Sequence, residues 1–266
     1  IKGFRPRAEQ LEMAYAVGKA IQNKSSLVIE AGTGTGKTFA YLAPALVFGK
    51  KTIISTGSKN LQDQLFNRDL PAIKKALNFT GKIALLKGRA NYLCLERLDQ
   101  VIAQGVLGDK SVLAELSKVR KWNNSTKTGD FTECIELAED SPIIPQLTST
   151  AESCLGTDCP NYSECYVASA RKKALNADLV VVNHHLFFAD MAVKESGFGE
   201  LIPNAEVIIF DEAHQLPDIA SQYFGQSLTS RQLFDLCKDI NIVYRTELKD
   251  MQQLSTTSDT LLKVAQ

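Results

Sequence analysis

The sequence predicts an α/β fold in which a parallel sheet is flanked by helices. Two apolar runs without alternation, 179–182 and 207–210, have the pattern of strands buried on both faces of a parallel sheet. Shorter apolar runs alternate with helical patterns in the first part of the chain, as expected when helices pack on the faces of such a sheet. These shorter runs are 27–29, 52–55 and 82–86.

Helical periodicity accounts for most of the intervening chain. Apolar residues recur at helical spacing within 4–23, a second helix is expected to end at Phe48, and a third covers 58–66. Further helices are predicted at 92–103 and 112–122. The chain therefore reads as strands and helices in alternation, followed by a mainly helical stretch.

Composition divides the chain into three parts. The alternation of strands and helices assigns 1–86 and 178–216 to one domain. An insertion at 87–177 has helical patterns, the only tryptophan and no convincing buried strand. The remaining residues, 217–266, are again helical. We predict a mainly helical inserted domain and the beginning of a further helical domain.

Length and composition bound the class of protein. The chain has 266 residues, 44% hydrophobic and 23% charged, so it can bury a substantial core and is not disordered. No apolar run reaches about 18 residues, which excludes a membrane-spanning helix. Because 30 basic and 30 acidic side chains balance, any nucleic-acid site must be a local patch. The start at Ile1, the end at Gln266 within a helical pattern and the missing signal peptide predict a piece of a longer, cytoplasmic protein.

Residues 31–38, Ala-Gly-Thr-Gly-Thr-Gly-Lys-Thr, form a Walker A loop with alanine in the first glycine position. Its glycines let backbone N–H groups turn inward around phosphate oxygens, and the following helix directs its positive end at the same anion. Lys37 is expected to reach the β- and γ-phosphates, and the Thr38 hydroxyl to bind Mg²⁺. The loop residues predicted to contact ATP are Gly34, Thr35, Gly36, Lys37 and Thr38.

The segment 211–214, Asp-Glu-Ala-His, directly follows the last apolar run. Asp211 is expected to hold Mg²⁺ through water, and Glu212 to polarise the attacking water as a general base. Alone, the acidic pair could equally be the start of a helix. Combined with the Walker A loop, it predicts an ATP hydrolase whose catalytic residues are Lys37, Asp211 and Glu212. For the histidines His184 and His185, packing and function are equally good explanations.

Four cysteines of the insertion have a spacing typical of a metal site, namely Cys94, Cys154, Cys159 and Cys165. Four thiolates satisfy either a tetrahedral Zn²⁺ ion or a [4Fe–4S] cube. The gaps of four and five residues favour the bulkier cube, because structural zinc sites more often use pairs two residues apart. Cys134 and Cys237 have no partner pattern and are predicted to be small core residues.

Several segments are candidates for contacts to a nucleic-acid strand. The hydroxyls, amides and lysine of 55–59 can hold a phosphate without reading bases, although a capped helix explains them equally well. If the cysteines gather their flanking segments, basic and aromatic side chains would form a surface suited to a single strand. The predicted contacts are Ser55, Thr56, Ser58, Lys59, Arg89, Tyr92 and Arg171, with Lys87 beside them. Upstream, Arg7 and Gln10 are predicted ATP contacts, the glutamine at the adenine edge.

Taken together, 31–38, 55–59, 211–214 and the order of the four cysteines resemble the superfamily 2 iron–sulfur helicases related to XPD, and most closely the bacterial DinG-type branch. The resemblance implies an ATP-dependent motor that moves 5′→3′ on single-stranded DNA and unwinds duplexes in DNA repair or replication. It also implies a RecA-like sheet, a [4Fe–4S] cluster within 87–177 and the start of an arch domain at 217–266. The implied partners are single-stranded or forked DNA and the chi subunit of DNA polymerase III holoenzyme.

Members of that family carry a second RecA-like domain with an arginine finger, and nothing in this sequence resembles it. Because an arginine finger contributes about 10³–10⁵ in turnover, we expect these residues alone to hydrolyse nucleotide very slowly and not to unwind DNA. Two alternatives stay open. One is a P-loop ATPase switch with a structural four-cysteine zinc module, and the other is a non-catalytic DNA-binding or partner-docking fragment.

Overall fold

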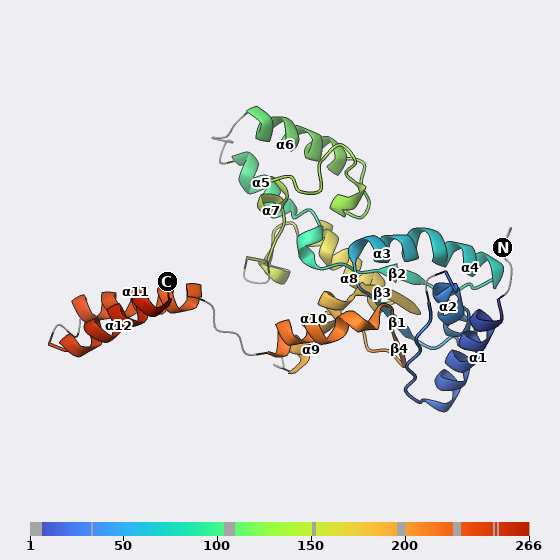
Figure 1. Ribbon diagram of the computed structural model, residues 1–266. Helices are drawn as coiled ribbons and strands as arrows, with labels where there is room; N and C mark the ends of the chain where they lie inside the picture. Colours follow the sequence, from blue (N-terminus) through green and yellow to red (C-terminus); the bar gives the residue numbers. More distant parts are fainter. Residues whose placement is uncertain are drawn as a thin grey trace. The chain divides into compact units, whose positions relative to one another are not determined.

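A computed structural model of the chain describes residues 7–32, 34–103, 110–150, 153–195, 201–225, 230–246, 248 and 250–265. Two compact units divide between Ile219 and Ala220. The first contains a four-stranded sheet with the helices around it and the inserted region, and the second contains a helical hairpin (Figure 1).

The α-helices of the described chain are α1 (Ala8–Asn23), α2 (Lys37–Phe48), α3 (Lys59–Gln64), α4 (Leu70–Ala76), α5 (Leu95–Ala103), α6 (Lys110–Asn123), α7 (Ile144–Leu147), α8 (Tyr166–Leu175), α9 (His184–Glu195), α10 (Leu216–Phe224), α11 (Ser230–Thr246) and α12 (Gln252–Ala265). A π-helical turn, η1 (Leu65–Asp69), joins α3 to α4, so the helix expected to end at 66 continues. Short 3₁₀ turns are η2 (Arg89–Asn91), η3 (Phe131–Glu133), η4 (Gly156–Asp158), η5 (Tyr162–Glu164) and η6 (Ala213–Gln215).

The sheet confirms the predicted α/β fold. Its strands are β1 (Thr52–Thr56), β2 (Ile83–Leu85), β3 (Leu179–Asn183) and β4 (Val207–Phe210), all parallel, in the order β2-β3-β1-β4. The central strands β1 and β3 are buried at every position. For β3 this is the burial that its uninterrupted apolar run predicts.

Helices cover both faces of the sheet. On one face, side chains of α2, η1 and α4 pack against Ile54, Leu179 and Val181 in a single apolar core. Side chains alternate along a strand, so the residues next to Ile54 point to the opposite face. There α9 packs on the sheet, and the rings of Phe187 and Phe210 lie 4.8 Å apart. The strand ends that follow these buried residues carry the site described below.

Two predictions about the strands are wrong. Residues 27–29 form no strand, and Val28 is 95% exposed. β4, expected to be buried on both faces, pairs only with β1 among the described strands and leaves Ile208 47% exposed. A run of three apolar residues is too short to be stable as a strand without hydrogen bonds to a neighbouring strand, and no described strand pairs with 27–29. β4 has a strand neighbour on one side alone among the described strands, which leaves part of it open to solvent.

The inserted region has a core of its own. Buried side chains from α5, α6, α7 and the turns between them pack together, and Trp122 stacks on Phe131 with ring centroids 5.5 Å apart. The predicted helices at 92–103 and 112–122 are α5 and α6. Cys134 is buried in this core, as the sequence predicts.

The second unit is a hairpin of α11 and α12. Cys237 is fully buried between them, and the Ser258 hydroxyl donates to its carbonyl oxygen at 3.3 Å. This burial agrees with the prediction of a small core cysteine. The limits 87–177 and 217–266, as domain boundaries, stay predictions.

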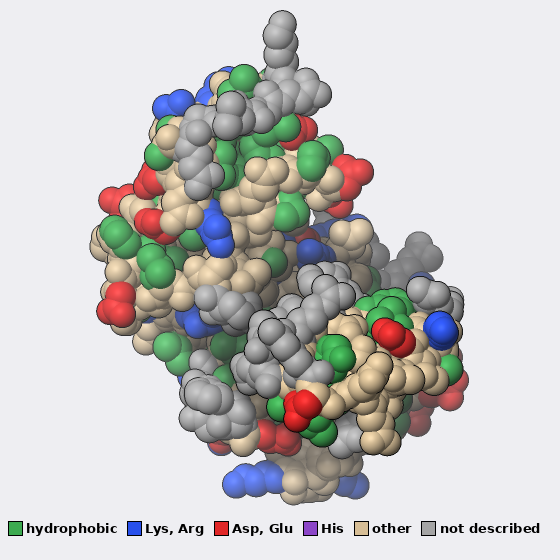
Figure 2. Space-filling view, turned by 90° about the vertical axis from the view of Figure 1, so that its left-hand side faces the viewer, with side chains coloured by type: hydrophobic (Ala, Val, Ile, Leu, Met, Phe, Trp, Pro, Cys, Tyr) green, Lys and Arg blue, Asp and Glu red, His purple; other side chains and the backbone are tan. Residues whose placement is uncertain are grey.

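The described surface reflects the balanced composition. On the face drawn in Figure 2, acidic and basic side chains are scattered among apolar and neutral ones. No helix among the described residues combines the length and the apolar character that crossing a membrane requires.

Candidate functional site

The Walker A loop leads directly into α2. Gly34 and Gly36 have φ angles of 79° and 84°, a left-handed conformation that glycine adopts without steric cost. Gly36 is the N-cap of α2, so the first N–H groups of that helix face the loop. The Lys37 ammonium donates to the carbonyl oxygen of Ala31 at 3.3 Å and lies 3.6 Å from Glu212 Oε1. The loop and the acidic motif, far apart in sequence, therefore meet at Lys37.

Arg7 and Gln10, predicted to contact ATP, hold the loop itself. Gln10 Nε2 donates to the carbonyl oxygen of Gly36 at 2.9 Å, and the Arg7 guanidinium donates to that of Gly34. A Cβ atom on Gly36 would lie 2.1 Å from Gln10 Nε2 and would displace that side chain from the loop, and the φ angle of 84° itself favours glycine. Both side chains support the loop, and their contact with adenine stays a prediction.

Tyr41 connects the two predicted Mg²⁺ ligands. Its hydroxyl donates to Asp211 Oδ2 at 3.1 Å, and Thr38 is a second hydrogen-bonding neighbour of the same hydroxyl. Burial, and then the neighbouring Glu212, raise the pKa of Asp211, while the Tyr41 hydroxyl and Lys37 oppose the rise. A carboxylate short of solvation gains strongly from a nearby divalent cation. The sequence analysis missed Tyr41, although its position one turn after Thr38 on α2 was a usable signal.

Glu212 has an unusual backbone. Its φ of 57° and ψ of 45° are left-handed, which is uncommon outside glycine and often marks a functional residue. This conformation turns the carboxylate toward Lys37 on one side and His214 on the other, whose Nδ1 lies 3.4 Å from Oε2. The general base predicted from sequence is thus held over the loop from two directions.

Comparison with known proteins agrees with this geometry. The chain matches the DEAD/DEAH box helicase family over residues 12–128. It is 99% identical over 266 residues to the ATP-dependent DNA helicase YoaA of Haemophilus influenzae and 64% identical to that of Escherichia coli strain K12. It is 36% identical over 253 residues, 87% of the chain, to the ATP-dependent helicase DinG of Mycobacterium tuberculosis. The chain belongs to the DinG-type DEAD/DEAH-box helicases. It spans 42% of the length of each YoaA relative and 37% of that DinG protein.

In this DinG-type chain, His184 joins the acidic motif to the 55–59 segment. The ring is fully buried, with Nδ1 2.7 Å from Ser55 Oγ and Nε2 2.9 Å from the carbonyl oxygen of Asp211. Burial lowers the pKa of the imidazole and favours its neutral form. Because a carbonyl only accepts, Nε2 carries the proton, and the Ser55 hydroxyl donates to Nδ1. His184 therefore has a defined structural role between two motifs, which the sequence left open.

The exchange His184→Ala is expected to lower the free energy of unfolding by about 1–3 kcal/mol, because it leaves buried polar groups of Ser55 and Asp211 without partners. Urea unfolding followed by circular dichroism measures the loss. The amide of His184→Gln can accept from the Ser55 hydroxyl and donate to the Asp211 carbonyl oxygen, so this variant should recover part of the lost stability. Wild-type stability in the alanine variant would show that these two hydrogen bonds do not hold the motifs together.

Three of the predicted DNA contacts have buried side chains, and their contact with DNA stays a prediction. Ser55 is turned toward His184, and Thr56 Oγ1 donates to the carbonyl oxygen of Ser58 at 3.3 Å. Tyr92 is 3% exposed, and its hydroxyl accepts the backbone N–H of Lys87 at 3.0 Å. Hydroxyls at the end of a central strand resemble an open loop in sequence, and the register of the sheet places them inside.

The other predicted DNA contacts reach the surface. Ser58 and Lys59 are exposed, and Ser58 Oγ accepts the N–H of Leu61 at 3.2 Å, so the capped-helix explanation holds for the serine. Arg89 donates to the carbonyl oxygen of Thr150 at 3.3 Å. Burial, and then repulsion from Arg89, lower the pKa of Arg171, so these two guanidinium groups are neighbours. Lys59, Arg89 and Arg171 stay candidates for phosphate contacts.

Lys87, expected on the same surface, is instead a buried junction. Its ammonium is 0% exposed and lies 2.8 Å from Asp63 Oδ1 in α3 and 2.7 Å from Asp130 Oδ2 in the inserted region. It also donates to Thr132 Oγ1 at 3.0 Å. One lysine thus ties the helix that follows β1 to the inserted region. The sequence does not predict this junction, because Asp63, Lys87 and Asp130 are far apart in the chain and belong to no recognisable motif.

The four cysteines of the insertion lie in one neighbourhood. Burial, opposed by backbone hydrogen bonds, raises the pKa of Cys94, and Cys159 and Cys165 add to the rise. Cys154 and Cys165 are both electrostatic neighbours of Arg171. Cys159 and Cys165 each follow a 3₁₀ turn, η4 and η5. No three His, Cys, Asp or Glu side chains of the described residues are close enough to hold a single metal ion.

Proposed function

We propose that this chain is the nucleotide-binding motor portion of an ATP-dependent DNA helicase that moves 5′→3′ on single-stranded DNA. The observation that carries the proposal is the convergence of Lys37, Asp211 and Glu212, with Tyr41 between Asp211 and Thr38. The names of the YoaA relatives support the DNA substrate. In this proposal 1–86 and 178–216 form the first RecA-like domain, and 217–266 begins an arch domain.

Each residue of the nucleotide site then has a defined task. The loop from Gly34 to Thr38 binds the phosphates of ATP through backbone N–H groups, and Lys37 leaves Glu212 to bind the terminal phosphates. Thr38 and Asp211 would hold Mg²⁺, which neutralises phosphate charge when bound. Glu212 orients the attacking water and accepts its proton.

For the cysteines we propose a [4Fe–4S] cluster held by Cys94, Cys154, Cys159 and Cys165 within a domain at 87–177. Four thiolates are a complete ligand set for the cube. Their neighbourhood supports the proposal, because Cys94 interacts electrostatically with Cys159 and Cys165, and Cys154 and Cys165 both interact with Arg171. The alternative, a zinc module in an ATPase switch, predicts a colourless protein, whereas the cluster predicts a brown one.

The exchange Cys159→Ser is expected to remove bound iron, destabilise the inserted region and lower affinity for single-stranded DNA, while nucleotide binding stays unchanged. Visible absorbance with iron quantification, oligonucleotide anisotropy and a nucleotide titration on anaerobically prepared protein measure these effects. Cys134→Ser is the matched control, because Cys134 is buried in the same region without a ligand role. Undiminished DNA binding by an iron-free Cys159→Ser protein would contradict the role of the cluster.

The partners and the compartment belong to the same proposal. We propose single-stranded or forked DNA as the substrate, with Lys59, Arg89 and Arg171 as phosphate contacts, in DNA repair or replication. The chi subunit of DNA polymerase III holoenzyme and a cytoplasmic location rest on the family resemblance alone.

The deciding experiment measures ATP turnover with and without single-stranded DNA and unwinding of duplexes with a 5′ or a 3′ tail. A protein as long as the YoaA relatives should be stimulated by DNA and unwind from the 5′ tail. The 266-residue chain alone should turn over very slowly and not unwind. Lys37→Ala should abolish the full-length activity, and indifference to that change would favour the docking-fragment alternative.

A further inference from the structure

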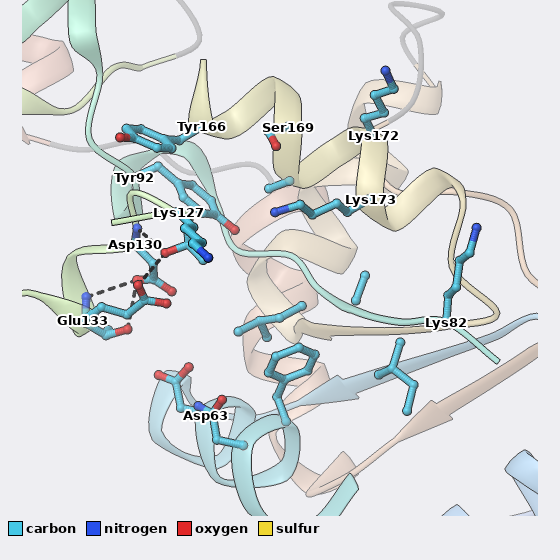
Figure 3. Close-up of a pocket in the computed structure, with 18 of the residues that line it drawn as sticks. Asp63, Lys82, Tyr92, Lys127, Asp130, Glu133, Tyr166, Ser169, Lys172 and Lys173 are labelled. Atoms are coloured by element: carbon cyan, nitrogen blue, oxygen red, sulfur yellow. Dashed lines mark hydrogen bonds between the residues drawn. The ribbon is translucent and has the colours of Figure 1, made fainter. Parts of the chain in front are cut away.

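A cavity of about 600 Å³ lies beside the edge strand β2, within the range of about 300–1,000 Å³ typical of ligand sites (Figure 3). β2 lines it along its whole length, together with the end of α3, η1 and α8, and residues 127–133 of the inserted region close one end. The Walker A loop and the acidic pair contribute nothing to this lining. The cavity is therefore distinct from the nucleotide site.

β2 offers open backbone groups to this cavity. β3 is its only neighbour among the described strands. The carbonyl oxygen of Lys82 and the N–H of Leu86 bond to β3 at 3.2 and 3.0 Å, so every second residue faces that neighbour. The intervening Ile83 and Leu85 direct their N–H and C=O groups to the other side, where the cavity lies. An open strand edge inside a groove is a template for the addition of a strand.

The acidic side chains that line the cavity are already occupied. Asp63 and Asp130 both pair with the buried Lys87, at 2.8 and 2.7 Å. Glu133 accepts a hydrogen bond from the Thr128 hydroxyl at 2.7 Å. One ammonium, that of Lys87, is thus shared by two of these carboxylates, and the hydroxyl leaves the charge of Glu133 in place. The lining also carries four lysines, Lys82, Lys127, Lys172 and Lys173, so its basic side chains outnumber its acidic ones.

The lysines around the cavity are not compensated. Lys82, Lys127 and Lys173 form no ion pair within the described part of the chain. Figure 3 shows Lys173 reaching from α8 across the cavity and Lys127 lying beside Tyr92, whereas the ammonium of the neighbouring Lys172 points away. The opening of the groove is therefore basic.

We propose that this groove binds an acidic, extended segment of a partner protein as a strand added to β2. The edge supplies main-chain hydrogen bonds, and apolar walls that include Phe66 and Ala170 accept alternate side chains. Lys127 and Lys173 pair with the acidic side chains of the partner segment, which alternate with its apolar ones. A nucleic-acid strand brings negative charge but cannot match backbone donors and acceptors that repeat at the spacing of a β-strand. The proposal is independent of the helicase function.

The probe is a short fluorescein-labelled peptide of alternating glutamate and valine, titrated with the chain and followed by anisotropy. Saturable binding is expected, and the double change Lys127→Glu with Lys173→Glu should weaken it about tenfold or more. Lys172→Glu is the matched control, with the same charge change on the same helix and an ammonium directed away, and should bind like wild type. All three lysines are exposed, so the variants should fold.

Two further measurements separate strand addition from simple charge attraction. N-methylation along one backbone edge of the peptide should abolish binding, and the bound peptide should slow amide hydrogen exchange at Ile83 and Leu85. Equal binding by the N-methylated peptide, or no binding at millimolar concentration, would overturn the proposal. So would an oligothymidylate that displaces the peptide and slows exchange at the same two amides, because the groove would then be a nucleic-acid site.

Discussion

Replacing Glu212 by glutamine is expected to lower ATP turnover of the full-length protein by about 10²–10⁴-fold, while nucleotide still binds. Glutamine has nearly the same size as glutamate and should leave the left-handed backbone at residue 212 unchanged. Its amide cannot accept the proton of the attacking water. It also removes the negative charge 3.6 Å from Lys37, so the lysine is freer to meet phosphate. Turnover should therefore fall while nucleotide affinity holds or rises, and steady-state hydrolysis with a fluorescent-nucleotide titration measures both.

A matched control lies just before the same strand. Glu206 precedes β4 as Glu212 follows it, and its carboxylate forms a solvent-exposed pair with Lys50 at 3.1 Å. A solvent-exposed ion pair contributes little to the stability of the fold. Glu206→Gln should therefore leave the turnover within a small factor of wild type. A Glu212→Gln enzyme that turns over normally would assign the base to another group and leave the strained backbone at Glu212 unexplained.

The parts of this site that sequence predicts are those with local patterns. Glycines at fixed spacing before a lysine, and two acids after an apolar run, each carry their chemistry within a few residues. Tyr41 and His184 act through neighbours that are distant in sequence, and only the register of β1, β3 and β4 brings those neighbours together. Burial was misjudged for the same reason, since Ser55 and Thr56 look like loop residues until the adjoining strands are placed.

Apolar runs predicted strands correctly where the sheet buries them on both faces, as in β3. The run 27–29 has the same composition in miniature, but a short run cannot reveal whether a neighbouring edge receives it. The inserted region was predicted from composition and cysteines. The ion pairs of Lys87 that connect this region to α3 were not predicted, because buried ion pairs do not recur at a regular spacing in the sequence.

Replacing Lys87 by methionine is expected to lower the free energy of unfolding by about 3–5 kcal/mol, because removing one partner of a buried ion pair leaves uncompensated charge. Asp130 is 7% exposed and would lose its countercharge, and Asp63, at 25%, would recover part of its hydration. The loss should therefore fall at the lower end of that range. Urea unfolding of the chain, with tryptophan fluorescence reporting on Trp122 in the inserted core, measures it.

The rescue variant distinguishes lost charge balance from lost packing. Lys87→Met combined with Asp63→Asn and Asp130→Asn leaves no buried charge, so it should regain most of the stability lost by the single change. Lys50→Met is the matched surface control, and removal of that exposed pair with Glu206 should cost well under about 1 kcal/mol. If Lys87→Met cost no more than Lys50→Met, the junction would not fasten the inserted region to α3. If the triple variant stayed as unstable as the single one, the packing of the lysine stem would matter more than its charge.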